Sequence, residues 1–342
     1  MTNKSNNNIQ ILIRIILRKP YTFYKRFKLR NSFKRTYRYD MDSYLRYSRT
    51  FGANDPGRLI GSIILQYHVI EKGLTMPESR LGFGQERIIS LCRDCVKYIE
   101  KYGQNDEQVN HAIAVVLEYE NLHRKNRFDL DEETIHSLIQ LKDRLISPVQ
   151  RAVQIQTGRD ELFSKKDYSF PEFSASRCSV RNYSAEDVPL KGIMDALELA
   201  KHSPSACNRQ SWRTYVYTQK SMINKLLELQ GGNRGFGHLV NKLIIVAGEQ
   251  GLFCNSNERN QVYIDGGIYT MNLLYALHYE RIAACVLNCS FDPEKEIELK
   301  RNAGIKDSEV LIVMIACGIA PDEFKVAISH RYPVERTNRI IN

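Results

Sequence analysis

Residues 203–212 read SPSACNRQSW, and this short polar stretch decides how the rest of the chain is interpreted. It places two serines around a proline, then two amide side chains, and it ends at the only tryptophan of the chain. A buried structural turn rarely combines these residue types, whereas a loop that holds a planar polar ligand uses small side chains and amide donors. The alternative is a helix end followed by a turn that an asparagine side chain stabilises. The first interpretation requires that other segments supply the rest of a ligand site.

Two strings of basic and hydroxyl-bearing residues are candidates for that role. The first, SRCSVRNY at 176–183, spaces its basic and hydroxyl side chains two residues apart, which puts them on one side of an extended backbone. The second, SHRYP at 329–333, supplies another such pair near the other end of the same half. Guanidinium and hydroxyl groups that converge suit a phosphate, although strings of this kind also occur as solvated surface charge. The candidate anion-binding residues are Arg177, Ser179, Arg181, Ser329 and Arg331.

The hydrophobic pattern changes near residue 175. Before it, apolar residues recur at helical spacing in four segments that glycines and acidic helix starts separate. After it, amphipathic helices alternate with short strands rich in valine and isoleucine, which is typical of an α+β layer domain. The expected division is a basic arm at 1–43, a helical domain at 44–146, a connector at 147–173 and an α+β domain at 174–342.

The order of the motifs in the α+β half resembles the flavin-dependent nitroreductase family. RxSxR comes first, then PSxxNxQxW, then a GN turn, a long helix with DGG, and a final SxR, over about residues 174–338. The resemblance implies an α+β sandwich, with a central mixed sheet flanked by helices, that follows a small all-α domain. It also implies FMN bound at a homodimer interface, hydride transfer at the flavin N5 atom, and NAD(P)H as electron donor.

The resemblance also assigns residues to the flavin by position. The segment 177–181 and the final SxR would hold the phosphate and ribityl end, and the loop after Pro204 would reach the flavin of the partner subunit. Two departures from the family pattern are Ser211, where proline is usual, and residues 280–284, where a glycine-rich turn is usual. The cofactor-binding residues implied are Arg177, Ser179, Arg181, Pro204, Ser205, Ala206, Asn208, Asn233, Leu287, Asn288, Ser329 and Arg331.

The net charge of +10 belongs to the N-terminal arm. The first 40 residues hold eleven Lys and Arg and one acid, so the remainder has 38 basic (49 less 11) and 38 acidic residues (39 less 1). A neutral body excludes a nucleic-acid-binding face across the protein, so we expect no nucleic-acid partner. The basic, Ile- and aromatic-rich segment 9–38 either lies on an anionic membrane surface or forms a solvated tail that contacts a partner.

The eight cysteines are scattered, which favours reduced thiols in a cytoplasmic protein over a disulfide scaffold. The basic arm adds a membrane-peripheral location as the alternative. Cys92 and Cys95 form a C-x-x-C, but no second pair or nearby histidine completes a zinc site. We expect no metal. The two cysteines lie at apolar positions of a helical pattern, where cysteine acts as a small hydrophobic residue.

One string in the helical domain, YHVIEKGL at 67–74, places His68 and Glu71 on a shared helix face. They are either weak catalytic candidates, as acid and base partners in a pocket, or an ordinary helix-surface pair. A similar string accompanies nitroreductase-like proteins associated with bacterial surface-polysaccharide gene clusters, and the resemblance is limited to this segment.

We therefore expect an FMN-dependent oxidoreductase that passes hydride, through the flavin, from NAD(P)H to a small-molecule acceptor. Apart from His68 and Glu71, no side chain is expected to act as a catalytic group, because the flavin carries the chemistry. Two alternatives are open. One is a flavin-fold membrane or assembly protein without turnover, and the other is a specialised flavin dehydrogenase in surface-polysaccharide biosynthesis.

Overall fold

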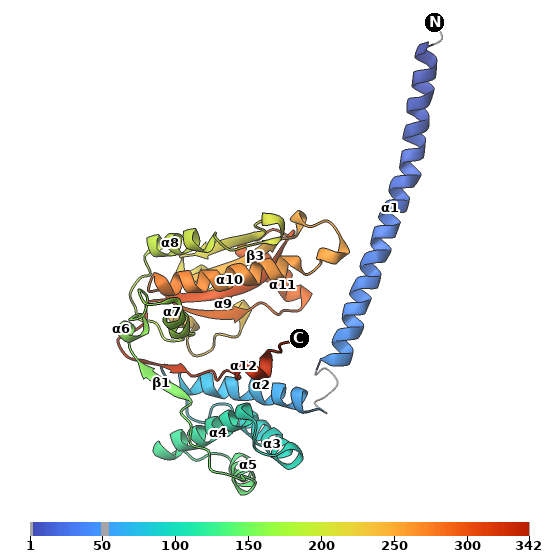
Figure 1. Ribbon diagram of the computed structural model, residues 1–342. Helices are drawn as coiled ribbons and strands as arrows, with labels where there is room; N and C mark the ends of the chain where they lie inside the picture. Colours follow the sequence, from blue (N-terminus) through green and yellow to red (C-terminus); the bar gives the residue numbers. More distant parts are fainter. Residues whose placement is uncertain (1–2, 49–54, 342) are drawn as a thin grey trace.

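The N-terminal arm forms one long helix in the computed structural model, which describes residues 3–48 and 55–341. This helix, α1 (Asn3–Tyr47), projects far beyond the rest of the molecule (Figure 1). Its C-terminal third meets the body: the Ser32 and Ser256 hydroxyls lie 2.8 Å apart, and Arg259 donates to the Asp40 carboxylate at 2.6 Å. Within the described residues, no helix is both long and apolar enough to cross a bilayer.

A small all-α domain follows, as the sequence predicts. An aspartate begins each of three helices, because the side chains of Asp55, Asp106 and Asp131 accept hydrogen bonds from first-turn backbone N–H groups. The apolar faces pack into one core, in which Cys92 and Cys95 are buried. The helices are α2 (Pro56–Leu74), α3 (Gln85–Tyr102), α4 (Glu107–Lys125) and α5 (Glu132–Asp143).

The second half is built on a four-stranded sheet between two helical layers. Alternate residues of β3 (Lys242–Glu249) point to opposite faces, so its apolar run KLIIV is buried on both sides. Leu243 and Ile245 pack with one helix pair, and Ile244 and Val246 pack with the other. The first pair is α9 (Lys220–Gln230) and α11 (Pro293–Ala303), and the second is α8 (Leu190–Ala200) and α10 (Gln261–Tyr279).

The strand order is β2–β3–β5–β4, and every pairing in the described residues is antiparallel. The α+β architecture is confirmed, but a mixed sheet was expected. The reason for the difference is that β3 and β4, which α10 connects, run parallel to each other yet are not neighbours. The late strand β5 inserts antiparallel between them. The remaining bounds are β2 (Trp212–Tyr217), β4 (Ala283–Asn288) and β5 (Glu309–Gly318).

A two-stranded ribbon joins the two halves. β1 (Gln154–Thr157), within the expected connector, pairs antiparallel with β6 (Phe324–Ala327) near the C-terminal end. The ribbon places the segment after β6 against the helical domain, where α2 lies between the α+β half and the other domain helices (Figure 1). Short helices complete the chain: α6 (Arg159–Leu162), α7 (Phe170–Ser176) and α12 (Val334–Thr337).

Candidate functional site

The segment after α7 runs beside β4 and turns its polar side chains outward. The Val180 N–H donates to the Ala284 carbonyl at 3.0 Å, and the Val180 side chain is buried. The Tyr183 hydroxyl, buried beneath the segment, donates to the carbonyls of Val180 (2.8 Å) and Ala316 (3.0 Å). With Val180 facing the core, Ser179 and Arg181 face the other way.

The segment after β6 makes a sharp turn at Ser329. This residue has φ of 50°, in the left-handed region that a non-glycine residue rarely adopts. Its N–H donates to Glu71 Oε1 of α2 at 3.0 Å, and the Arg331 guanidinium donates back to the Ser329 carbonyl. The turn is thus held from the helical domain, and it directs Ser329, His330 and Arg331 toward the segment 179–181.

These two segments and α2 enclose one cleft of about 370 Å³. Four of the residues predicted as anion ligands line it together, although they are separated by about 150 positions in the chain. The helical domain closes the cleft from the α2 side. The lining residues are Ile64, Tyr67, His68, Ser179, Arg181, Val286, Ser329, His330 and Arg331.

The cleft has the electrostatic character of an anion site. Its lining contains no carboxylate, and within the described ranges no ion pair reaches Arg177 or Arg181. Both guanidiniums are close enough to oppose the rise in the Cys178 pKa, which burial brings to about 11. Half-buried cations without a counter-charge are costly unless an anion compensates them. The guanidiniums of Arg181 and Arg331, with the two serine hydroxyls and the His68 imidazole, therefore fit the phosphate of a cofactor such as FMN, whereas the second imidazole, His330, is paired with Glu107 at 2.8 Å.

Arg177 lies beside this cleft and does not line it. It borders a much smaller cavity of about 10 Å³, together with His278 of α10. Burial lowers the pKa of His278 to about 4, and the charge of Arg177 adds to the effect. The His278 Nε2 atom lies 2.8 Å from the Ser176 hydroxyl. Arg177 thus stands at the rim, between the anion cleft and the end of α10.

The loop that includes Pro204, Ser205, Ala206 and Asn208 lies elsewhere, at the N-terminal end of α10. The Asp265 carboxylate accepts from the Ala206 N–H at 3.2 Å, and the Ser205 hydroxyl accepts from the Gln210 N–H at 2.9 Å. Cys207, Asn208 and Gln210 all have positive φ, so the loop has a strained backbone. Asn208 is exposed and does not reach the cleft of its own chain.

Trp212 is not a wall of the cleft. Its ring stacks on Tyr269 of α10, with centroids 4.7 Å apart and planes 12° apart. The tryptophan therefore anchors β2 to α10 directly after the strained loop.

Three further predicted cofactor residues do not line the cleft. The Asn233 amide donates to the Leu227 carbonyl at 2.5 Å and so braces the turn after α9. Leu287 is buried, and the exposed Asn288 accepts at its carbonyl from Gln230 Nε2 at 3.2 Å. Among the residues of β4, the cleft is lined by Val286.

Glu71 is the feature whose environment the sequence interpretation did not anticipate. The carboxylate is fully buried, and its Oε1 accepts from His111 Nε2 (3.0 Å) as well as from the Ser329 N–H. Its Oε2 lies 3.5 Å from His68 Nδ1. Burial favours the neutral acid, but the hydrogen bonds outweigh it and hold the pKa of Glu71 at about 2. One signal was present in the sequence: Glu71 lies on the apolar face of α2, with Ile63, Tyr67 and Leu74.

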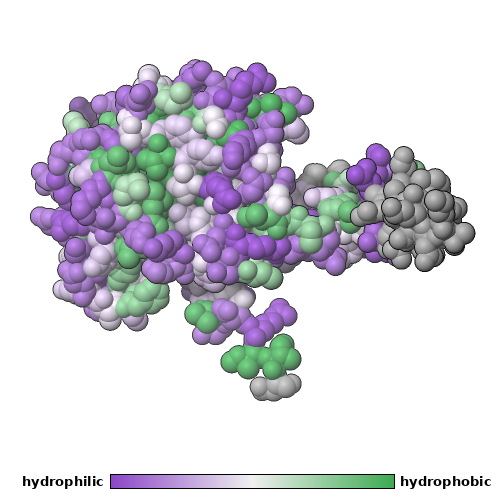
Figure 2. Space-filling model, turned by 90° about the horizontal axis from the view of Figure 1, so that it is seen from above, coloured by the Kyte–Doolittle hydropathy of each residue, from purple (hydrophilic) through white to green (hydrophobic). Residues whose placement is uncertain are grey.

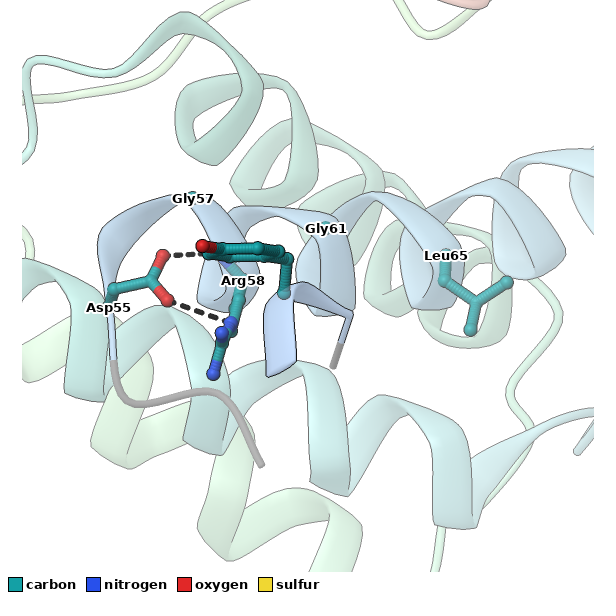
Figure 3. A pocket seen from close by; sticks show the side chains of 6 residues that line it. Asp55, Gly57, Arg58, Gly61 and Leu65 are labelled. Carbon is teal, nitrogen blue, oxygen red and sulfur yellow. Dashed lines mark hydrogen bonds and ion pairs between the residues drawn. The ribbon is translucent and has the colours of Figure 1, made fainter. Parts of the chain in front are cut away.

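Two other pockets lack a comparable cluster of basic and hydroxyl side chains. Figure 3 shows one of about 650 Å³ at the start of α2, where Arg58 is already paired with Asp55 at 3.0 Å. An open depression of about 980 Å³ over α3 mixes acids and bases, among them Arg93 and Asp94. Neither selects an anion.

The geometry defines an α+β sheet protein with a cationic cleft, and comparisons show which known proteins parts of the chain resemble. Residues 175–233 match the model of the nitroreductase family. A segment of 72 residues is 39% identical to an iodotyrosine dehalogenase 1 homolog of Caenorhabditis elegans, over 20% of this chain and 22% of that protein. A segment of 50 residues is 44% identical to a 4-nitrobenzoate reductase of a Nocardioides species, over 15% of this chain and 20% of that protein.

The matched segments span about a fifth of the length of these curated relatives. Among solved structures, a nitroreductase family protein of Streptococcus pneumoniae aligns with a TM-score of 0.45 at 19% identity, over 51% of this chain and all of that one. An FMN-dependent nitroreductase of Clostridium difficile aligns with a TM-score of 0.42 at 17% identity, over 50% of this chain and 98% of that one. The segment matched by the family model opens the α+β half.

Proposed function

We propose that this protein is an FMN-dependent oxidoreductase. The observation that carries the proposal is the cleft in which Ser179 and Arg181 meet Ser329 and Arg331 with no acidic side chain in the lining. The match of residues 175–233 to the nitroreductase family supports a flavin as the ligand. Bound FMN would supply hydride transfer at its N5 atom, and NAD(P)H is the proposed donor.

In this proposal the residues of the cleft bind and orient the cofactor. Arg181 and Arg331 neutralise the phosphate, and the hydroxyls of Ser179 and Ser329 donate to its oxygens or to the ribityl chain. Arg177, at the rim, would be available to contact the pyrimidine edge of a bound flavin. The helical domain covers the cleft from α2 and keeps water from the phosphate end, so the acceptor has to enter from the opposite side.

A homodimer completes the proposed site. The 204–208 loop cannot reach the cleft of its own chain, so a second copy has to supply it. An exposed apolar face on α8 and α10 supports this arrangement: Met194 is 55% exposed, Ile264 51% and Ile268 41%. Figure 2 shows apolar patches between the hydrophilic areas of this half. Light scattering of the purified protein should give about twice 39.6 kDa, and a monomer that binds flavin would contradict the shared site.

The arm supports a second candidate role, contact with an anionic membrane surface. The helix α1 exposes Phe23 (73%), Tyr24 (60%) and Phe27 (56%) among lysines and arginines. Aromatic and basic residues together favour the interface of anionic bilayers. A role in surface-polysaccharide biosynthesis stays a prediction from the resemblance of residues 67–74.

The first experiment is an absorbance spectrum of the purified protein, followed by anaerobic addition of NADH and then NADPH. Flavin bands near 370 and 450 nm (about where the free chromophore absorbs) that bleach on addition are the expected result. Bands that persist would remove the nicotinamide donor and favour the specialised dehydrogenase or the protein without turnover. If no bands appear even after FMN is added, the proposal is wrong.

A further inference from the structure

The face of α2 that closes the cleft carries two basic side chains one helical turn apart. His68 lines the cleft, with 41% of its side chain exposed. Lys72 follows four residues later on the same helix face, one turn beyond the residues that line the cleft. Its half-buried ammonium is close to Arg181, since burial first and then this guanidinium lower the pKa of Lys72. Within the described ranges no carboxylate pairs with Lys72.

Three cations, Lys72, Arg177 and Arg181, therefore gather around Cys285 of β4. Burial raises the pKa of the Cys285 thiol, and the charges of all three cations oppose that rise. The three cations therefore lie near the same sulfur atom. Like charges that lie close together repel one another, and among the described residues no carboxylate forms an ion pair with any of the three. A bound anion would compensate this positive charge. It would contact Lys72 of the helical domain as well as the two arginines of the α+β half.

The buried carboxylate of Glu71 holds this arrangement in place. Because an ionised carboxylate only accepts hydrogen bonds, His111 donates from Nε2 and the His68 nitrogen that faces Glu71 is Nδ1. The other nitrogen of His68, Nε2, is then free to face the cleft. Through the Ser329 N–H, the same carboxylate holds the turn that carries Arg331.

We propose that His68 and Lys72 bind a phosphate group of the ligand and that Glu71 positions His68 and the 329–331 turn for this contact. The helical domain would then be part of the binding site as well as its cover. This proposal rests on the proposed function in one respect: the phosphate that His68 and Lys72 bind can be the phosphate of FMN. The other source is a phosphate-bearing substrate that binds beside the flavin.

The test compares FMN with riboflavin, which lacks the phosphate, in the full-length protein. We measure dissociation constants by flavin fluorescence for the wild type, His68→Gln and Lys72→Met. Controls are the exposed, matched variants His136→Gln and Lys97→Met. If the group is the FMN phosphate, each test variant weakens FMN roughly tenfold or more and leaves riboflavin binding unchanged. The controls should change neither.

A second arm distinguishes the two sources. Inorganic pyrophosphate is titrated by calorimetry into the FMN-saturated wild type and the same variants. Unchanged FMN affinity, together with pyrophosphate binding that His68→Gln and Lys72→Met abolish, assigns the residues to a substrate phosphate. If neither titration responds to either variant, the proposal is overturned. If the wild type binds no flavin, the proposed function is wrong. The phosphate-binding proposal is then tested by pyrophosphate binding to the flavin-free wild type and variants.

The positioning role of Glu71 needs its own variants. Glu71→Gln is expected to lower FMN or pyrophosphate affinity as His68→Gln does, and Glu71→Asp should restore part of it. In the double variant Glu71→Gln/His68→Gln the losses should not add, because both changes disable the same contact. Losses that add fully, or equal losses of riboflavin and FMN affinity, would show a merely structural role.

Discussion

Replacing Glu71 by glutamine tests how the two halves of the protein are joined. Glutamine has nearly the same shape, and its one oxygen can accept from His111 Nε2 and the Ser329 N–H, as Oε1 of the carboxylate does now. Its NH₂ group takes the place of Oε2, which lies 3.5 Å from His68 Nδ1. The substitution therefore removes the buried negative charge beside His68 and His111 and keeps an oxygen for the two donors. Breaking a buried charge network by removing one partner costs about 3–5 kcal/mol.

The dependence on pH gives an independent magnitude. The folded-state pKa of Glu71, about 2, lies below its ordinary value of 4.5. A group with a depressed pKa stabilises the fold above its unfolded pKa and loses that contribution as the pH falls through the folded pKa. A difference of this size corresponds to about 3 kcal/mol. That stabilisation should be complete at pH 7 and should decline between pH 4.5 and pH 2.

The assay is urea unfolding of the wild type and Glu71→Gln at pH 7, 5, 4 and 3, followed by circular dichroism. We expect the variant to be less stable by about 3 kcal/mol at pH 7 and the difference to shrink below pH 4. Glu86→Gln, at an exposed position of α3, is the control and should match the wild type. Equal stability of the two proteins at pH 7, or a difference that stays constant down to pH 3, would refute this account of Glu71.

Three further outcomes are expected. Arg181→Ala and Arg331→Ala should each weaken FMN binding by about 1.5–3 kcal/mol in titrations that leave riboflavin unaffected, and equal losses of both ligands would contradict a phosphate contact. Gly318→Ala should lower the free energy of unfolding by about 1–3 kcal/mol, because its methyl group would lie 2.4 Å from the buried Tyr183 ring; unchanged urea stability would show that the ring yields. Deletion of residues 1–30, which spares the contacts of α1 with the body, should abolish co-sedimentation with phosphatidylserine vesicles and leave flavin content intact; retained sedimentation would assign membrane contact elsewhere.

The secondary structure of the α+β half could be predicted closely, because each element has a local cause. The apolar run of β3 has the length of a strand buried on both faces, and Asp292 begins α11 by accepting from the Lys295 N–H at 2.9 Å. The order of the strands has no such local cause. The order depends on β5, which is the last of these four strands in the sequence and pairs with both β3 and β4.

In the candidate site, too, the features with a local cause could be predicted and those that depend on distant residues could not. The two-residue spacing at 177–181 predicts one shared side for three polar residues, and the structure places Ser179 and Arg181 in one cleft with Arg331, whereas Arg177 borders a separate cavity. That site stays a prediction until a ligand is measured. The hydrogen-bond partners of Glu71 could not be predicted from the sequence, because His111 and Ser329 are 40 and 258 positions away in the chain.

The structure also explains why the helical domain and the anion cleft should form together. Ser329 occupies a left-handed backbone conformation that costs a non-glycine residue about 1–2 kcal/mol, and the hydrogen bond from its N–H to Glu71 offsets this cost. The β1–β6 ribbon places the same turn beside α2, and His330 stacks on His111 with ring centroids 5.6 Å apart. Without the helical domain the turn loses the hydrogen bond to Glu71 and the ring contact with His111, and only the β1–β6 ribbon still supports the segment that carries Arg331. The nitroreductase-like half of this chain therefore depends on its helical partner for one wall of the cleft and for the geometry of the opposite wall.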